Sequence, residues 1–275
     1  MNAFAYQCIS LRKLDHSLSE IVRITGRPKA SVYPYIKNIP LSEKKLVAIR
    51  AKNKIHLLRV AALRKGKSTR GFSRFSWNKE TVLLVAHLLF DGEIKRTTCS
   101  YNNRNRALIK RVEHLMQPVY EFKPKRYKNF ITGVTRISYH NVALGAYMQE
   151  KSKELLSLAS ALPKELKREM LRAFFDDEGC MDFRPHRNVR QVRGYQKNIS
   201  ILKIIQLLLL DFNIGSSIKE PNEVVIVGKN DITRFQKEIN FSPGIRINGN
   251  RSNSIWRKHL EKRDILRRAI ASYLQ

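Results

Sequence analysis

The sequence predicts an α+β protein in which two halves repeat one plan behind a small all-α N-terminal unit. From Trp77 onward, the hydrophobic spacing predicts the order helix, strands, helix, strands, helix, and the plan then repeats. A similar nine-residue stretch opens each half, at residues 84–92 and 171–179. A 43% hydrophobic content is ample for a folded core, and 275 residues allow two domains.

Each of these two stretches is an apolar helical run that ends in a carboxylate followed by glycine. The endings are Asp91-Gly92 and Glu178-Gly179. Glycine is common where a helix stops, but a carboxylate there faces the negative end of the helix dipole, which costs roughly 0.3 to 1 kcal/mol. Either stretch alone could be an ordinary amphipathic helix with a surface acid. Their recurrence favours a shared use, and a divalent cation between the two carboxylates would remove the cost.

The two stretches resemble the signature helices of the LAGLIDADG (dodecapeptide) homing endonuclease family, in its two-motif, single-chain form. Asp91 and Glu178 fall on the last acidic position of the nine-letter motif, and each is followed by the motif's glycine. Ala86 and Ala173 take the small position that lets two such helices pack closely. The resemblance covers roughly residues 77–241. It implies two pseudo-twofold-related αββαββα half-domains whose antiparallel sheets bind DNA.

Three motif positions depart from the family pattern. His87 and Leu89 replace a leucine and an acid in the first copy, and Arg172 replaces a small residue in the second. The last acid and the glycine, which the chemistry needs most, are present in both copies.

The resemblance also implies a chemistry, the metal-assisted hydrolysis of DNA phosphodiesters. Asp91 and Glu178 would be the catalytic residues and would bind Mg²⁺ or Mn²⁺, with the backbone carbonyls of Phe90 and Asp177 completing the metal shell. Each carboxylate would serve one strand and give a staggered double-strand break. Because one chain carries both motifs, we expect a monomer. An assisting lysine is common in such sites, and Lys229 is offered for that role.

The charge balance predicts a polyanionic partner, here double-stranded DNA. The chain has 53 Lys plus Arg against 23 Asp plus Glu, a formal net charge of +30. The longest apolar run, residues 201–210, is too short to cross a membrane and contains Lys203 and Gln206. Three scattered cysteines form neither a disulfide framework nor a zinc site. A cytoplasmic protein is therefore expected, associated with the nucleoid in a prokaryote.

Basic and polar residues in the predicted strands are the candidates for contacts with the DNA major groove. Strands are expected at residues 93–101, 120–123 and 130–139 in the first half, and at 180–183, 189–195, 216–220 and 223–227 in the second. The pattern leaves open which sheet face each side chain takes, because a one-residue slip inverts the assignment. The candidates are Lys95, Arg96, Lys123, Lys125, Arg126 and Arg136, and then Arg184, Arg187, Arg190, Gln191 and Arg193.

The N-terminal residues have the rhythm of a helix-turn-helix unit. Ser17 is a candidate N-cap, Gly26 a turn residue, and Pro28 opens a second helix. In that geometry the side chains that meet DNA are Arg27, Lys29, Ser31 and Tyr33. Pro34 should kink this helix or end it early. The alternative is a plain helical hairpin packed on the catalytic domain.

These patterns divide the chain into five segments. They are a helix-turn-helix-like unit at 1–40, a basic helix and linker at 41–76, half-domains at 77–160 and 161–243, and a basic tail with a helix from about Ser254 at 244–275. A site-specific homing endonuclease is the favoured function. A DNA-binding transcriptional regulator on a catalytically inactive fold, or an RNA-binding splicing cofactor (maturase), is the alternative.

Overall fold

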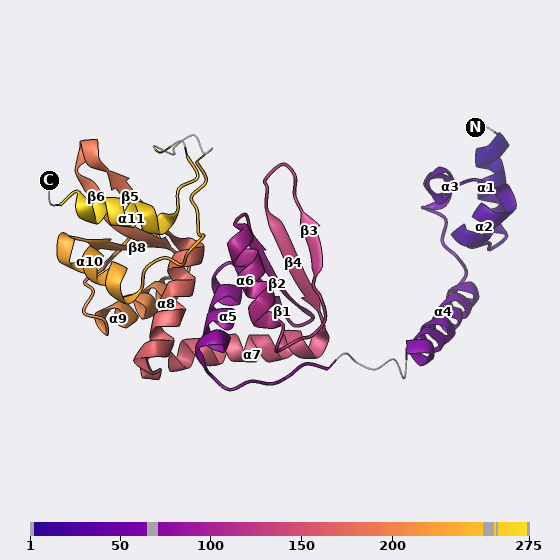
Figure 1. The fold of residues 1–275 in the computed structure, drawn as a ribbon. Coiled ribbons are helices and arrows are strands. Elements are labelled where there is room, and N and C mark those ends of the chain that lie inside the picture. The colour runs from indigo at the N-terminus through magenta and orange to yellow at the C-terminus, as the bar shows by residue number, and fades with distance from the viewer. Residues whose placement is uncertain (1–2, 65–70, 250–255, 257, 274–275) are drawn as a thin grey trace. The chain divides into compact units, whose positions relative to one another are not determined.

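Two compact units make up the computed structural model, Met1–Thr69 and Arg70–Gln275. The structure describes residues 3–64, 71–249, 256 and 258–273, with the side chains of 61–64 left out. The predicted helix-and-linker segment at 41–76 therefore lies partly outside the described residues, as does the expected start of the last helix near Ser254. Each unit is described here by itself (Figure 1).

The N-terminal unit contains three short helices, α1 (Ala3–Lys13), α2 (Leu18–Thr25) and α3 (Lys29–Ile36), followed by a longer one, α4 (Glu43–Arg64). Ser17 caps α2 through a capping box with Glu20, and Gly26 ends it at a φ of 65°. Cys8, Ile21, Val32 and Ile36 form the buried core of the three short helices. α2 and α3 are therefore joined by the short turn expected at Gly26.

Pro34 does not end α3, which continues to Ile36. A proline removes the hydrogen bond to the carbonyl four residues earlier, here that of Ala30. Ala30 is exposed, so water can bind this carbonyl, while Val32 and Ile36 are buried on the other side of the helix. Burial of these two side chains holds the last turn in place.

The second unit consists of two halves with the same order of elements. The first half contains α5 (Lys79–Phe90), β1 (Gly92–Lys95), β2 (Thr98–Asn103), α6 (Arg106–Met116), β3 (Lys125–Lys128), β4 (Thr135–His140) and α7 (Val142–Leu158). The second contains α8 (Lys164–Glu178), β5 (Gly179–Arg184), β6 (Val189–Tyr195), α9 (Ile199–Leu210), β7 (Ser217–Lys219), β8 (Glu223–Val227) and α10 (Lys229–Glu238), and α11 (Lys262–Ala271) follows. The predicted αββαββα plan is confirmed in both halves.

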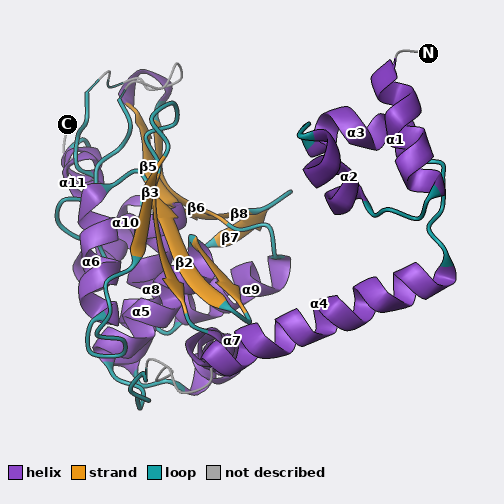
Figure 2. Ribbon diagram, turned by 90° about the vertical axis from the view of Figure 1, so that its right-hand side faces the viewer, coloured by secondary structure: helices purple, strands orange, loops and turns teal. Residues whose placement is uncertain are grey.

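Each half has one antiparallel four-stranded sheet, in the orders β1-β2-β4-β3 and β5-β6-β8-β7. Helices pack against the inner face of each sheet and form one continuous apolar core across both halves (Figure 2). Three strand predictions are wrong in part: the expected strand at 93–101 is two strands with a turn at 96–97, residues 120–123 are not a strand, and the strand expected at 130–139 begins only at Thr135. None of the helices in the described ranges has the length and hydrophobicity needed to cross a membrane.

Helices α5 and α8 pack together at the centre of this unit. Ala86 and Ala173 are fully buried in the shared core, as their place in the repeated stretch predicts. Aromatic rings also contact one another between the two helices: the centroids of the Phe90 and Phe174 rings lie 5.2 Å apart in an edge-to-face arrangement. The carboxyl-terminal ends of the two helices therefore arrive at one place.

Candidate active site

The two helix-terminal carboxylates line the same cavity. Asp91 caps the end of α5, and Glu178 is the last residue of α8. Both line a cavity of about 750 Å³ that also receives Asn103 and Lys262. The cavity thus lies at the carboxyl ends of both signature helices, where the sequence predicts the acidic site.

Burial and like charge raise the pKa values of both carboxylates. Burial first, and then the charges of Asp177 and Glu178, raise the pKa of Asp91 to about 7, although the hydrogen bond from Asn103 acts against this rise. Burial, followed by the charge of Asp177, also raises the pKa of Glu178 to about 7, and Lys262 opposes this rise. The protein therefore compensates the negative charge of these two carboxylates only in part.

This donor set fits a divalent cation that keeps several waters. Among the described residues, no group of three or more His, Cys, Asp or Glu side chains could enclose a metal ion. Mg²⁺ binds oxygen ligands and is commonly held by one or two carboxylates together with waters and phosphate oxygens. Asp91 and Glu178 supply such a pair, and a bound cation would offset the burial and the repulsion that raise their pKa values.

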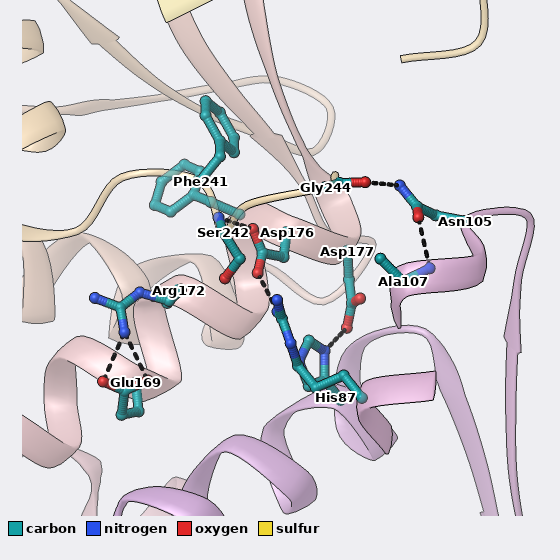
Figure 3. Close-up of polar contacts among 12 residues, drawn as sticks. His87, Asn105, Ala107, Glu169, Arg172, Asp176, Asp177, Phe241, Ser242 and Gly244 are labelled. Carbon is teal, nitrogen blue, oxygen red and sulfur yellow. Dashed lines mark hydrogen bonds and ion pairs between the residues drawn. The ribbon is translucent and has the colours of Figure 1, made fainter. Parts of the chain in front are cut away.

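A chain of polar contacts joins the two helices beneath the carboxylates. His87 Nδ1 lies 2.8 Å from Asp177 Oδ2, with both side chains fully buried (Figure 3). Tyr101 donates its hydroxyl to Asp177 Oδ1 over 2.6 Å, and Asn103 Nδ2 donates to Asp91 Oδ2 over 2.6 Å. His87, a departure from the family motif, thus has a partner in the opposite helix.

The side chain of Asp177 is therefore engaged inside the protein. One of its oxygens contacts His87 and the other accepts the hydrogen bond from Tyr101. Its backbone carbonyl stays the predicted ligand that the family resemblance implies. Phe90, the other proposed carbonyl ligand, is the last residue of α5 and directly precedes Asp91.

Lys262 is a site residue that the sequence reading missed. Its ammonium donates to the backbone carbonyl of Asp176 over 2.7 Å and to that of Phe175 over 3.3 Å. Burial lowers the pKa of Lys262, and nearby acids, Asp176 first, oppose this change. The lysine places a cation at the negative end of α8, where it offsets the dipole cost of Glu178.

The C-terminal segment holds Lys262 in place. The backbone N–H of Lys262 donates to Ile245 over 2.8 Å, and that of Gly244 donates to the carboxylate of Glu261 over 3.1 Å. Asp176 adds a further link, because its carboxylate binds Arg111 and the backbone of Ser242. Lys229, the lysine offered from the sequence, is the exposed first residue of α10 and does not line the cavity.

The strand register decides which candidate DNA contacts lie on the outer sheet face. Residues paired across antiparallel strands point to the same side. Glu93 and Lys95 pair with Ser100 and Thr98, and Asn102 pairs with Arg136. The same reasoning applies to the second sheet. The candidates on the outer faces are Lys95, Lys125, Arg136, Arg184, Gln191 and Arg193.

Two candidates lie on the opposite, helix-covered face and are not part of this surface. Arg126 pairs with Glu113 of α6. Arg190 donates to the hydroxyl of Ser272 over 2.7 Å, and its guanidinium lies 4.8 Å from the centroid of the Tyr273 ring. Successive side chains in a strand point to opposite faces, so a shift of one residue moves a side chain from the outer to the inner face. The sequence pattern left this choice of face open.

The other predicted contacts are exposed outside the strands. Arg96 lies in the β1–β2 turn, Lys123 precedes β3, and Arg187 lies between β5 and β6. In the N-terminal unit, the four predicted side chains are all exposed on α3 or just before it: Arg27, Lys29, Ser31 and Tyr33.

Ion pairs hold the outer-face arginines of the second unit. Arg136 contacts Glu93 over 2.9 Å. Arg193 contacts Asp182 over 3.2 Å and also pairs with Glu223. These guanidinium groups are therefore positioned before any ligand arrives.

Comparison with known proteins identifies the second half. Its residues 165–240 match the family model described as a LAGLIDADG-like domain. Residues 165–240 form a LAGLIDADG-like domain. The resemblance read from the sequence is thereby confirmed, and the first half repeats the same element order and strand order.

Solved structures with a similar fold include LAGLIDADG proteins. I-DmoI in complex with DNA and Mn is 14% identical, with a TM-score of 0.46 over 58% of this chain and 96% of that chain. The N-terminal LAGLIDADG domain of DUF199/WhiA is 18% identical, with a TM-score of 0.46 over 62% of this chain and 88% of that chain. Full-length DUF199/WhiA from Thermatoga maritima is 16% identical, with a TM-score of 0.46 over 74% of this chain and 69% of that chain. No curated protein sequence matches the chain.

Proposed function

We propose that this chain is a site-specific homing endonuclease that cuts double-stranded DNA with the help of a divalent metal. The observation that carries the proposal is the pair of carboxylates, Asp91 and Glu178, at the ends of two packed helices in one cavity. Their pKa values of about 7 mark groups whose charge lacks a full partner. A formal net charge of +30 supports a polyanionic substrate.

In this proposal the protein's own groups prepare the site for phosphodiester hydrolysis. Asp91 and Glu178 would hold Mg²⁺ or Mn²⁺, and the backbone carbonyls of Phe90 and Asp177 would be further ligands. A bound divalent ion supplies Lewis acidity, lowering the pKa of a bound water and stabilising the leaving oxygen. Asn103 orients Asp91 through its hydrogen bond, and each carboxylate serves one strand.

Lys262 has a positioning role in the same scheme. By binding two carbonyls at the end of α8, it fixes the turn that carries Glu178 and supplies positive charge beside the cavity.

Solved structures of I-DmoI with DNA and Mn, and with DNA and Ca, lend support by analogy for the substrate and the metal class.

DNA would lie against the outer faces of the two sheets. Backbone contacts would position the duplex, and base-edge contacts in the major groove would select the site. Because one chain supplies both halves, the protein would act as a monomer, in the cytoplasm and on the nucleoid of a prokaryotic host. The outer-face residues that make these contacts are Lys95, Lys125, Arg136, Arg184, Gln191 and Arg193, with Arg96, Lys123 and Arg187 at strand ends.

A second candidate function is a DNA-binding regulator on a catalytically inactive fold. The three-helix N-terminal unit favours it, because α3 carries exposed Lys29, Ser31 and Tyr33 after the exposed Arg27. A helix of this kind can enter a major groove and read an operator. In the endonuclease proposal the same helix adds further contacts to the DNA.

The two functions are separated by selection from a random-sequence duplex library in Mg²⁺, with bound and cut molecules scored separately. The endonuclease predicts that one long sequence is recovered in both pools and is cut on both strands. A regulator predicts a bound sequence with no cut product. Recovery of no duplex sequence above background would contradict both proposals.

A further inference from the structure

The turn between β3 and β4 carries two large apolar side chains in solvent. Phe130 is 85% exposed and Ile131 is 98% exposed. Both residues lie between β3 and β4, and the hairpin of these two strands projects from the first half (Figure 1). This is the segment expected from the sequence to begin a strand, but the strand begins only at Thr135.

The backbone of this tip is closed by its own hydrogen bonds. Asn129 donates its N–H to Val134 over 2.9 Å and accepts one from Gly133 over 2.8 Å. The Asn129 side-chain oxygen accepts the N–H groups of Ile131 and Thr132, both over 3.0 Å, and Gly133 has a φ of 70°. The tip is therefore a defined turn that presents Phe130 and Ile131 outward.

The strand register places this tip beside the candidate active site. Thr135, which follows the tip, pairs with Asn103, whose side chain donates to Asp91. Val134 lines the cavity that holds Asp91 and Glu178. A duplex whose phosphates reach these carboxylates would therefore pass next to the tip.

Positive charge around the tip favours a polyanionic partner. The Lys128 ammonium lies 5.2 Å from the centroid of the Phe130 ring. Lys125 and Lys128 are exposed on β3, and Arg104 lines the adjoining cavity. Proteins that kink DNA combine basic and polar side chains with apolar ones, such as Phe and Ile, that insert between base steps.

We infer that Phe130 and Ile131 form an apolar wedge that enters bound duplex DNA beside the cut site and unstacks one base step. The inference rests on the proposed DNA cleavage function. Insertion would bend the duplex and favour flexible pyrimidine–purine steps at that position. The wedge would thus add selectivity where no side chain reads a base edge.

The test uses the full chain and a selected duplex, held uncut in Ca²⁺. Permanganate reactivity of thymines and fluorescence of single 2-aminopurine substitutions report unstacking at each central A·T pair. The variants are the double substitution Phe130→Ala/Ile131→Ala and the conservative Phe130→Leu. Val142→Ala is the matched control, because Val142 is an exposed apolar residue, 58% exposed, just beyond the opposite end of β4.

We expect the wild type, Phe130→Leu and Val142→Ala to unstack the same central step. The double alanine variant should lose this signal and bind about tenfold more weakly, because stacking and wedge contacts are lost. Truncating side chains this exposed leaves the fold intact, which circular dichroism checks. A bound wild-type complex with fully stacked central pairs, or an unchanged signal in the double variant, would overturn the wedge alone. Failure of the wild type to bind any duplex would overturn the proposed function as well.

Discussion

Neutralising Asp91 should stabilise the protein at pH 8. Its pKa is raised from 3.8 to about 7 in the folded protein, chiefly by burial. Between about pH 4 and pH 7 the folded state therefore holds more protons than the unfolded chain, and stability falls as the pH rises. Above about pH 7 the full cost of the buried charge is present, and Asp91→Asn removes it.

The size of this effect follows from the pKa difference. A pKa difference of about three between the folded and unfolded states corresponds to ~4 kcal/mol in the free energy of unfolding, if it is retained in full. Because the cavity is open to water, which screens the charge, we expect about 1–2 kcal/mol, or a rise of roughly 2–8 °C in Tm for a domain of this size. Glu178→Gln should act in the same direction, because the Glu178 charge contributes to the raised pKa of Asp91.

The assay is thermal unfolding of the wild type, both variants and a control at pH 5 and pH 8, with and without Mg²⁺. The stabilising effect should shrink at pH 5, and Mg²⁺ at pH 8 should raise the Tm of the wild type more than that of Asp91→Asn. Glu80→Gln is the control, because Glu80 is an exposed acid in the first turn of the same helix. If Asp91→Asn were destabilising by the same amount at both pH values, the account of these carboxylates would be wrong.

Three further predictions concern the surroundings of the site. His87→Leu should lower the free energy of unfolding by about 3 kcal/mol, because it leaves the buried Asp177 carboxylate without its partner. Adding Asp177→Ala should recover part of that loss, as measured by denaturant unfolding. If the losses of the two single substitutions simply added, the pairing would be refuted. Lys262→Met should lower the free energy of unfolding by about 1–3 kcal/mol, because two backbone carbonyls lose their donor. It should also lower the cleavage rate more than the DNA affinity measured in gel-shift assays. Unchanged stability and cleavage would refute the capping role. Arg193→Ala should weaken DNA binding and reduce its salt dependence, while Arg126→Ala, on the helix-covered face, should leave both unchanged; equal effects would refute the register argument.

Local patterns in the sequence were sufficient to predict the two signature helices and their carboxylates. Asp91 and Glu178 each end an apolar helical run before a glycine, and that pattern is visible within nine residues. The cap at Ser17 is equally local, because its side chain accepts the backbone N–H of Glu20, three residues later. Such features depend on neighbours in the chain and can therefore be predicted.

The parts that the sequence did not predict depend on contacts between distant segments. Lys262 reaches the end of α8 from the C-terminal segment, and no local pattern separates it from the many other lysines. His87 appeared only as a departure from a motif, because its partner Asp177 lies on the other helix. The faces of Arg126 and Arg190 depend on strand register, which residue types alone do not fix.

The most direct test of the proposed chemistry is cleavage of the selected duplex, with each strand labelled at one end, by the wild type, Asp91→Asn and Glu178→Gln in Mg²⁺. The account predicts that the wild type cuts both strands with a stagger and that both variants bind with unchanged or higher affinity but make no double-strand break. A variant that cuts both strands at the wild-type rate would contradict the assignment of that carboxylate. A wild-type protein that binds the site and never cuts it would contradict the endonuclease function and leave the regulator.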